Sequence, residues 1–249
     1  MAKKIDFCYL CGKSAPKPST RDHILPKSLF PKGEWNATAR LTMPTHLGCN
    51  TAYSADEQYL STIILPSGID IFPDALQAFS AVKRNWNRDA GKKQLASILK
   101  HAKPVEITTP GGIVIGKAIG IEVNVERVDR AVWKIARGII SYDTRCFVDI
   151  NTEKILAHIS TADLAKKASA PEFKEAFGGL FTKTALHYQP VEHVAIRRCY
   201  YLVGESVSGL EITASLIIML YTSSYIIQTN IVIEKSAFPS DLVLLGAKE

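Results

Sequence analysis

The sequence shows no segment with the pattern of a signal peptide or of a membrane-spanning helix. Its first six residues, Met-Ala-Lys-Lys-Ile-Asp, are charged and contain no apolar core of signal-peptide length. The most apolar stretch, residues 215–233, is interrupted by Thr222-Ser223-Ser224 and by Gln228-Thr229-Asn230. A membrane helix needs about 20 mostly apolar residues in a row. We therefore expect no membrane partner, and we expect this β-branched stretch to form paired strands.

Cysteines are few, and their number is odd. Three of the five, Cys8, Cys11 and Cys49, lie close to the amino terminus, whereas Cys146 and Cys199 are isolated beside apolar or aromatic residues. An odd count without a secretory signal argues against a disulfide framework. We expect the first three to bind a metal and the last two to be free, buried thiols. A reducing cytoplasm is then the expected location.

The sequence also lacks internal repeats and low-complexity tracts. Its 249 residues are enough for one large domain or two smaller ones, and its composition is that of a folded globular protein. We expect an α+β fold in two parts. Residues 1–66 form a small, motif-rich module, and residues 67–249 form a larger α+β domain with a recognition or regulatory role.

The small module is predicted to contain two strands followed by a helix. Short runs of Thr, Ile, Leu and Met predict a hairpin built from residues 20–25 and 40–45. Side chains then recur at helical spacing from Cys49 to about Leu65, and Pro66 is expected to end that helix.

Periodicity in the larger domain predicts further helices and strands. Helices are expected at 73–87, 92–103, 128–142 and 171–181, with Asp89-Ala90-Gly91 as the turn between the first two. A β-hairpin is expected from residues 105–109 and 113–125. The runs 191–203, 210–221 and 225–234 alternate and are rich in β-branched residues, so they predict an antiparallel sheet.

Two ligand pairs with the same spacing predict a structural zinc site. They are Cys8-x-x-Cys11, followed by Gly12 at the turn, and His46-x-x-Cys49. Structural zinc prefers four Cys and His ligands, and a Cys-x-x-Cys turn lets two thiolates reach one ion. A module this short has little core of its own, so zinc would contribute much of its folding free energy. The alternative, a surface histidine and buried thiols, explains the paired spacing less well.

Between the two pairs lies Asp22-His23, which suits phosphodiester chemistry. This hydrolysis needs a base that deprotonates water and a cation that neutralises charge on the leaving oxygen. The neutral imidazole of His23 is available near pH 7. Asp22 offers a hard oxygen to Mg²⁺ or Mn²⁺, and Asn50, directly after the last zinc ligand, offers a second. Neighbours on a strand point to opposite sides, but at a strand bend both can line one groove.

The net charge of +6 is concentrated in one segment. Seven basic residues lie there against one acid, Asp89; they are Lys83, Arg84, Arg88, Lys92, Lys93, Lys100 and Lys103. A local basic stripe is typical of a surface that binds a polyanion, because phosphate contacts supply most non-specific affinity. The alternative is a solvated helix face. Trp86 could stack on a base or pack on the core, and we favour the core. We expect the first five basic residues to contact a nucleic-acid backbone.

Residues 8–57, about a fifth of the chain, resemble an HNH endonuclease of the zinc-stabilised ββα-metal type. In that family a C-x-x-C pair, a D-H-x-x-P strand, a mid-loop Asn and a C-x-x-C-N helix start occur in this order. The resemblance implies that His23 is the general base and that Asp22 and Asn50 hold the catalytic metal. It also implies that Asn36 braces the loop that positions the base.

Two positions depart from the family pattern, and one acid is left over. His46 stands where many members carry Cys, which changes the geometry of the zinc site rather than its chemistry, and no Lys follows soon after Asn50. Glu57 lies seven residues past Asn50 on roughly the same helix face. It is either an outer partner of the site or a solvated acid, so it is not counted among the primary site residues.

The resemblance implies a metal-dependent DNA endonuclease that leaves 5′-phosphate and 3′-hydroxyl ends, with RNA as an alternative substrate. A nuclease that acts in restriction or antiphage defence would use the same chemistry. The other function considered is a non-cleaving, zinc-stabilised module that binds nucleic acid. The presence of Asp22, His23 and Asn50 together argues against it. The larger domain is expected to mediate recognition, homo-oligomerisation or contact with a regulatory partner.

Overall fold

The structure is a computed structural model with an α+β fold. It describes residues 5–15, 20–31, 41–69, 73–109, 111–145, 147, 155–160, 189–192, 199–205, 211–220 and 223–234. Asn36, Cys146 and the helix expected at 171–181 lie outside the described residues. Among the helices that are described, none is long and apolar enough to cross a membrane.

The amino-terminal part contains the expected hairpin and helix. Strands β1 (Thr20–His23) and β2 (Thr42–Thr45) pair antiparallel, and the short 3₁₀ helix η1 (Lys27–Leu29) follows β1. Helix α2 (Leu47–Gly68) follows β2 with only His46 between them. The predicted order of strand, strand and helix is therefore confirmed.

Helix α2 ends later than predicted. It continues to Gly68 and contains Pro66, which was expected to stop it. A proline removes one main-chain donor, which is costly in the middle of a helix but is tolerated more easily in the last turn. The main-chain N–H of Ile69 donates to the carbonyl of Pro66 at 3.5 Å and closes the helix. The domain boundary predicted at residue 66 thus falls inside the last turn of α2.

Helices α3 (Pro73–Trp86) and α4 (Asp89–Leu99) are joined more tightly than predicted. The segment expected to be a turn, Asp89-Ala90-Gly91, forms the first turn of α4, where the acid suits the positive end of the helix dipole. A Cβ on Gly91 would lie 2.0 Å from the carbonyl oxygen of Asn85, so only glycine fits this junction. The helix expected at 92–103 therefore begins and ends earlier, and residue 103 belongs to a strand.

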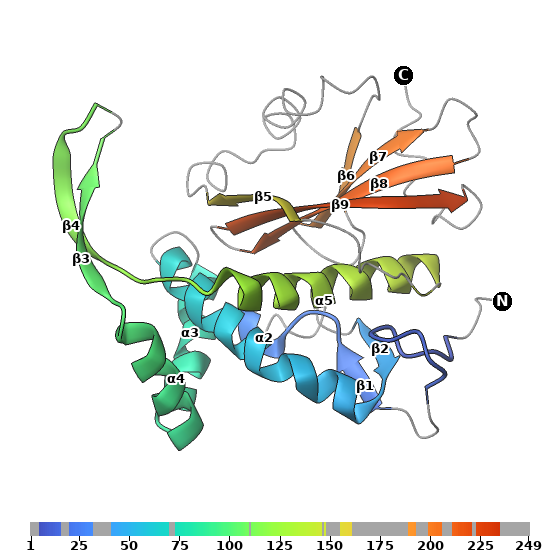
Figure 1. Ribbon diagram of the computed structural model, residues 1–249, viewed down its shortest axis with the longest axis horizontal. Coiled ribbons are helices and arrows are strands. Elements are labelled where there is room, and N and C mark those ends of the chain that lie inside the picture. Colours follow the sequence, from blue (N-terminus) through green and yellow to red (C-terminus); the bar gives the residue numbers. More distant parts are fainter. Residues whose placement is uncertain are drawn as a thin grey trace.

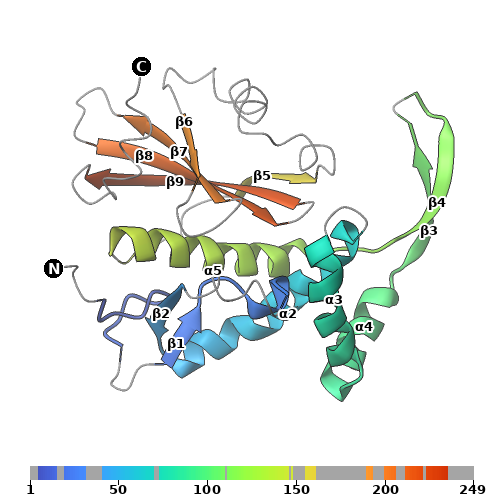
Figure 2. The ribbon, with the colours of Figure 1, turned by 180° about the vertical axis from the view of Figure 1, so that it is seen from behind.

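A β-hairpin extends away from the rest of the molecule, as both views show (Figure 1 and Figure 2). Strands β3 (Lys103–Thr108) and β4 (Val114–Gly120) pair only with each other among the described strands. Every residue of β3 is exposed. The predicted hairpin is confirmed, but its first strand begins two residues earlier and its second ends at Gly120, and residue 125 belongs to the following helix.

Helix α5 (Val125–Thr144) lies between the amino-terminal module and the carboxy-terminal sheet (Figure 1). The side chain of Asn124 caps its start by accepting a hydrogen bond from the Arg127 N–H at 3.1 Å. Its apolar face is buried, which confirms the amphipathic helix predicted for residues 128–142. The same helix thus supplies side chains to both neighbours.

Among the residues described, the carboxy-terminal sheet has five antiparallel strands in the order β5-β9-β8-β7-β6. They are β5 (Ile155–Ser160), β6 (Gln189–Glu192), β7 (Cys199–Glu205), β8 (Glu211–Leu220) and β9 (Ser223–Glu234). The predicted antiparallel sheet is confirmed. Of the run expected at 191–203, residues 191–192 belong to β6 and residues 199–203 to β7, and these two strands pair antiparallel. Strand β5 was not predicted, because its short run is paired through distant β9.

One hydrophobic core runs through the module, the helices and β8. It includes Ile24 next to β1, Leu60 of α2, Ile135 of α5 and Ile218 of β8. Helix α5 crosses the module at Gly138, where a Cβ would lie 2.7 Å from Cγ2 of Ile24. The missing side chain allows helix and strand to approach closely, which brings α5 next to the residues of β1.

Candidate functional site

Four predicted zinc ligands come together in space. The Sγ atoms of Cys8, Cys11 and Cys49 and a ring nitrogen of His46 all lie within 4.8 Å of one another. The Nδ1 atom of His46 is 3.4 Å from Sγ of Cys11 and 3.8 Å from Sγ of Cys49. Ligands bound to tetrahedral zinc at their usual bond lengths lie about 3.5–4 Å apart. This Cys₃His set can therefore hold Zn²⁺.

Local structure explains how each half of the cluster forms. In the first half, the N–H groups of Cys11 and Gly12 donate to the carbonyl of Cys8 at 3.3 and 2.8 Å. Gly12 has φ +72°, a left-handed conformation that favours glycine. In the second half, His46 caps α2 and Cys49 lies in its first turn, so a three-residue spacing puts both on one side.

Hydrogen bonding prepares His46 to bind a metal through Nδ1. Its Nε2 atom lies 3.1 Å from the main-chain carbonyl of Ser14, which can only accept a hydrogen bond. Nε2 therefore carries the proton, and the lone pair is on Nδ1, which faces Cys11 and Cys49. Metal-bound histidines usually donate their other N–H in this way. This contact supports the donor set.

The thiols of the cluster differ in acidity. Burial acts to raise the pKa of Cys8, but contact with the Thr45 hydroxyl and hydrogen bonds from main-chain N–H groups, first that of His46, lower it to about 6. Burial, the negative charge of Cys8 and a hydrogen bond with Cys11 raise the pKa of Cys49 to about 11. One thiolate is thus stabilised without a metal, whereas Cys49 needs a cation to release its proton.

The carboxylate of Asp22 on β1 is buried and held by two donors. The hydroxyl of Tyr9 donates to Oδ2 at 2.5 Å, and the ammonium of Lys134 on α5 lies 2.7 Å from the same oxygen. Burial and the charge of Asp22 raise the pKa of Tyr9 well above its ordinary value, so the hydroxyl keeps its proton and remains a donor. Both contacts engage Oδ2, and neither engages Oδ1.

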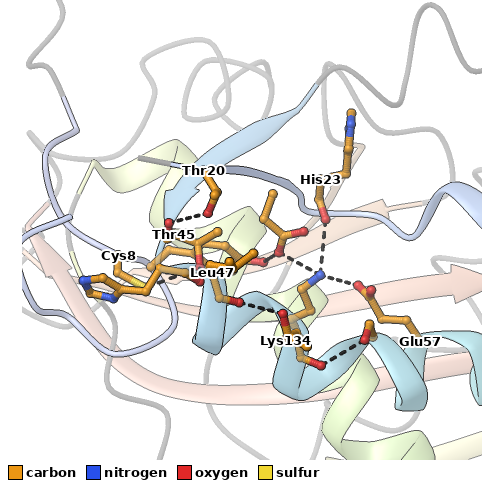
Figure 3. A network of polar contacts seen from close by, with 12 residues as sticks. Cys8, Thr20, His23, Thr45, Leu47, Glu57 and Lys134 are labelled. Carbon is orange, nitrogen blue, oxygen red and sulfur yellow. Dashed lines mark hydrogen bonds and ion pairs between the residues drawn. The ribbon is translucent and has the colours of Figure 1, made fainter. Parts of the chain in front are cut away.

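Lys134 is itself fully buried, with its side chain 0% exposed. Besides Asp22, its ammonium contacts the carboxylate of Glu57 on α2 and lies 3.4 Å from the main-chain carbonyl of His23 (Figure 3). Burial raises the pKa of Glu57, although the nearby ammonium acts to lower it. Glu57, whose side chain is 15% exposed, is therefore a largely buried partner of this lysine and not a solvated acid.

Sequence reasoning did not find Lys134, although one signal was available. The residue lies beside Ala131 and Ile135 on the buried face of α5. A lysine is almost never fully buried unless it is paired. A lysine inside an apolar helical stripe therefore predicts buried acidic partners, here Asp22 and Glu57.

His23 points away from this network. It is the next residue on β1, and successive strand residues face opposite sides. Figure 3 shows its imidazole directed away from Lys134, while its carbonyl faces the ammonium. Asp22 and His23 therefore lie on opposite sides of β1. The strand remains paired through His23, opposite Thr42, and the bend follows at residues 24–25.

Asn50 lies in the first turn of α2 and is half-buried, and its N–H donates to the His46 carbonyl at 3.0 Å. Its amide oxygen and an oxygen of Asp22 are hard donors of the kind that Mg²⁺ and Mn²⁺ prefer. Because Lys134 and Tyr9 both contact Oδ2 of Asp22, an ion bound by this carboxylate would be held through the other oxygen.

The predicted basic surface lies at the end of α3 and the start of α4. All five residues are exposed to solvent at least in part: Lys83, Arg84, Arg88, Lys92 and Lys93. Trp86 packs against the core, with its ring edge on Phe79 at a centroid distance of 5.3 Å, so the interpretation as a core residue is favoured. The stripe therefore presents charge to solvent without a stacking tryptophan at its centre.

Comparison with protein-family models, with curated proteins and with solved structures finds no match to this chain.

Proposed function

We propose that this chain is a metal-dependent endonuclease of the HNH type that hydrolyses DNA phosphodiester bonds. The observation that carries the proposal is the Cys₃His cluster, whose halves flank β1 and β2 in sequence and meet at the start of α2. Zinc in this cluster would fix the hairpin against the helix. His23 lies between the halves, with its imidazole outside the buried network.

In this proposal His23 acts as the general base. Its imidazole would accept a proton from the attacking water. Asp22 and Asn50 would hold Mg²⁺ or Mn²⁺, which supplies positive charge for the leaving oxygen. Asn36 retains the bracing role that the family resemblance implies.

The exposed basic residues of α3 and α4 would bind the DNA backbone. Cations on a surface bind phosphates without reading sequence, so this stripe would supply affinity and the remaining domain would supply selectivity. A role in restriction or antiphage defence in the cytoplasm is consistent with this division of work.

The proposal is tested by nicking of supercoiled plasmid with Mg²⁺ or Mn²⁺. We expect wild-type protein to nick and His23→Ala to lose at least about 100-fold in rate, because general base catalysis contributes on that order. His101→Ala is the matched control, since His101 is exposed and pairs only weakly with Glu122 at 3.8 Å. Equal rates for wild type and His23→Ala would contradict the assignment.

The second candidate is a zinc-stabilised module that binds nucleic acid without cleaving it. The observation that favours it is the engagement of the Asp22 carboxylate by Lys134 and Tyr9 in the interior. DNA binding without cleavage across several divalent metals would support this function over the first.

A further inference from the structure

Lys134 joins two elements of the module from outside it. Its side chain comes from α5, in the predicted second domain, and reaches β1 at Asp22 and His23 and α2 at Glu57 (Figure 3). The contacts with Glu57 and His23 link positions that are 77 and 111 residues apart in the sequence. The lysine is thus a point at which the larger domain touches the Asp-His pair.

The contacts of this ammonium account for all of its donors. An ammonium has three protons, and three acceptors lie around it: two carboxylates and one main-chain carbonyl. A buried charge is strongly destabilising unless it is paired and hydrogen-bonded, so this position holds the lysine in one orientation. The ammonium in turn holds the two carboxylates and the carbonyl in place.

For Asp22 the consequence is a fixed carboxylate. Lys134 and Tyr9 both bind Oδ2, and hydrogen bonds to a charged group are stronger than those between neutral groups. The carboxylate therefore cannot rotate freely, and its other oxygen keeps one direction. A metal ligand that is held in this way has less conformational freedom to lose when the metal binds.

For His23 the consequence is a fixed main chain. Its carbonyl faces the ammonium at 3.4 Å, while its ring lies on the opposite side of β1. Holding the carbonyl restrains the peptide between His23 and Ile24, and the orientation of that peptide helps to set where the imidazole projects.

We propose that Lys134 is a positioning residue for the nuclease site. It orients Asp22 toward a divalent cation and His23 toward water, although it touches neither the cation nor the water. This inference deepens the proposed function and depends on it for the assignment of Asp22 as a metal ligand. Removal of a residue that hydrogen-bonds to a metal ligand typically weakens metal affinity or activity by about 10-fold to 100-fold.

The first measurement is binding of Mn²⁺ to the full-length, zinc-loaded protein without DNA, followed by the decrease of the free-ion signal in electron paramagnetic resonance. Asp22→Ala identifies the Mn²⁺ that binds at this site. Lys134→Met leaves two buried carboxylates without their cation, so the double variant Lys134→Met/Glu57→Gln restores the charge balance. We expect the double variant to bind Mn²⁺ about 10-fold to 100-fold more weakly than wild type.

Two further variants separate positioning from general stability. Glu57→Gln alone removes one carboxylate charge but keeps the contact between Lys134 and Asp22, so we expect nearly wild-type Mn²⁺ affinity. Tyr9→Phe removes the other donor to Oδ2 and is expected to weaken Mn²⁺ binding in the same direction as removal of the lysine. In nicking assays the double variant should need more Mn²⁺ for half-maximal rate, with an unchanged KM for DNA.

The results of these measurements distinguish the role of Lys134 from the nuclease function. Unchanged Mn²⁺ affinity in the folded double variant, or an equal decrease in Glu57→Gln, would overturn the role of Lys134 while leaving the nuclease intact. Absence of Asp22-dependent Mn²⁺ binding in wild type would overturn it as well. If the affinities follow the expected order but wild type cleaves no DNA, Lys134 keeps its role at the metal site and the nuclease function fails.

Discussion

Sγ of Cys11 lies 3.4 Å from Nδ1 of His46, although 35 positions separate the two residues. The contact joins the turn before β1 to the residue that begins α2. A zinc ion bound there would tie the first part of the module to its last element. Because metal binding to such a site contributes to folding free energy, the stability of this region should depend on the metal.

Replacement of Cys11 by alanine is expected to release zinc and destabilise the amino-terminal module by more than about 3 kcal/mol, since a structural zinc site contributes directly to folding. Metal analysis and urea unfolding followed by circular dichroism measure the two effects. His23→Ala is the control and should leave zinc content and stability nearly unchanged. A wild-type protein that folds equally well after removal of all metal would contradict this prediction.

Zinc binding is expected to release protons and to strengthen as pH rises from about 7 to about 9, because the ligands must be deprotonated. Near neutral pH Cys8, with a pKa of about 6, is already mostly thiolate, whereas Cys49, with a pKa of about 11, still carries its proton. The complex requires thiolates, so the metal-free state holds more protons and higher pH favours the complex. Calorimetry in two buffers of different ionisation enthalpy counts the released protons, and a count of zero would refute the expectation.

Gly138→Ala is expected to destabilise the fold by about 1–3 kcal/mol, because the added methyl would overlap the side chain of Ile24, whose Cγ2 and Cγ1 lie 2.7 and 3.0 Å from it. Gly48→Ala on α2 is the matched control. No described atom lies within 4 Å of the position that its new methyl group would take, so this change should stabilise the protein by about 0.4–1 kcal/mol. Urea unfolding gives both values, and similar effects at the two sites would rule out the close approach at Gly138.

Removal of charge from the basic surface is expected to weaken DNA binding equally for all sequences. For Arg88→Gln, Lys92→Gln and Lys93→Gln, the slope of log affinity against log salt should fall by about one for each phosphate that the protein no longer neutralises. Lys117→Gln, an exposed lysine on β4, is the charge-matched control and should change neither quantity. Fluorescence anisotropy at several salt concentrations provides the slopes. A salt slope that none of the three substitutions changes would exclude this surface as the DNA-binding site.

Features set by local spacing were predictable from the sequence. The zinc ligands form two pairs with two-residue gaps, and a tight turn or one helical turn brings the members of each pair together whatever the rest of the chain does. The hairpin and helix around them, and the buried stripe of α5, follow from side-chain periods of 2 and 3.6 residues. Periodicity predicts element types well, but it missed the extra helical turns at Pro66 and Asp89, where capping and packing decide the boundary.

The sequence by itself determined the spacing of the Cys and His pairs, which the structure brings together, and the amphipathic α5. The catalytic role of the Asp-His dipeptide stays a prediction. Only the tertiary structure decided that Asp22 faces the interior and His23 faces outward. That choice depends on Lys134, 111 positions after His23, and on Gly138, which lets α5 approach Ile24. A buried ammonium requires acidic partners, and which acids it meets is decided by how helices pack, a long-range property that no local pattern encodes.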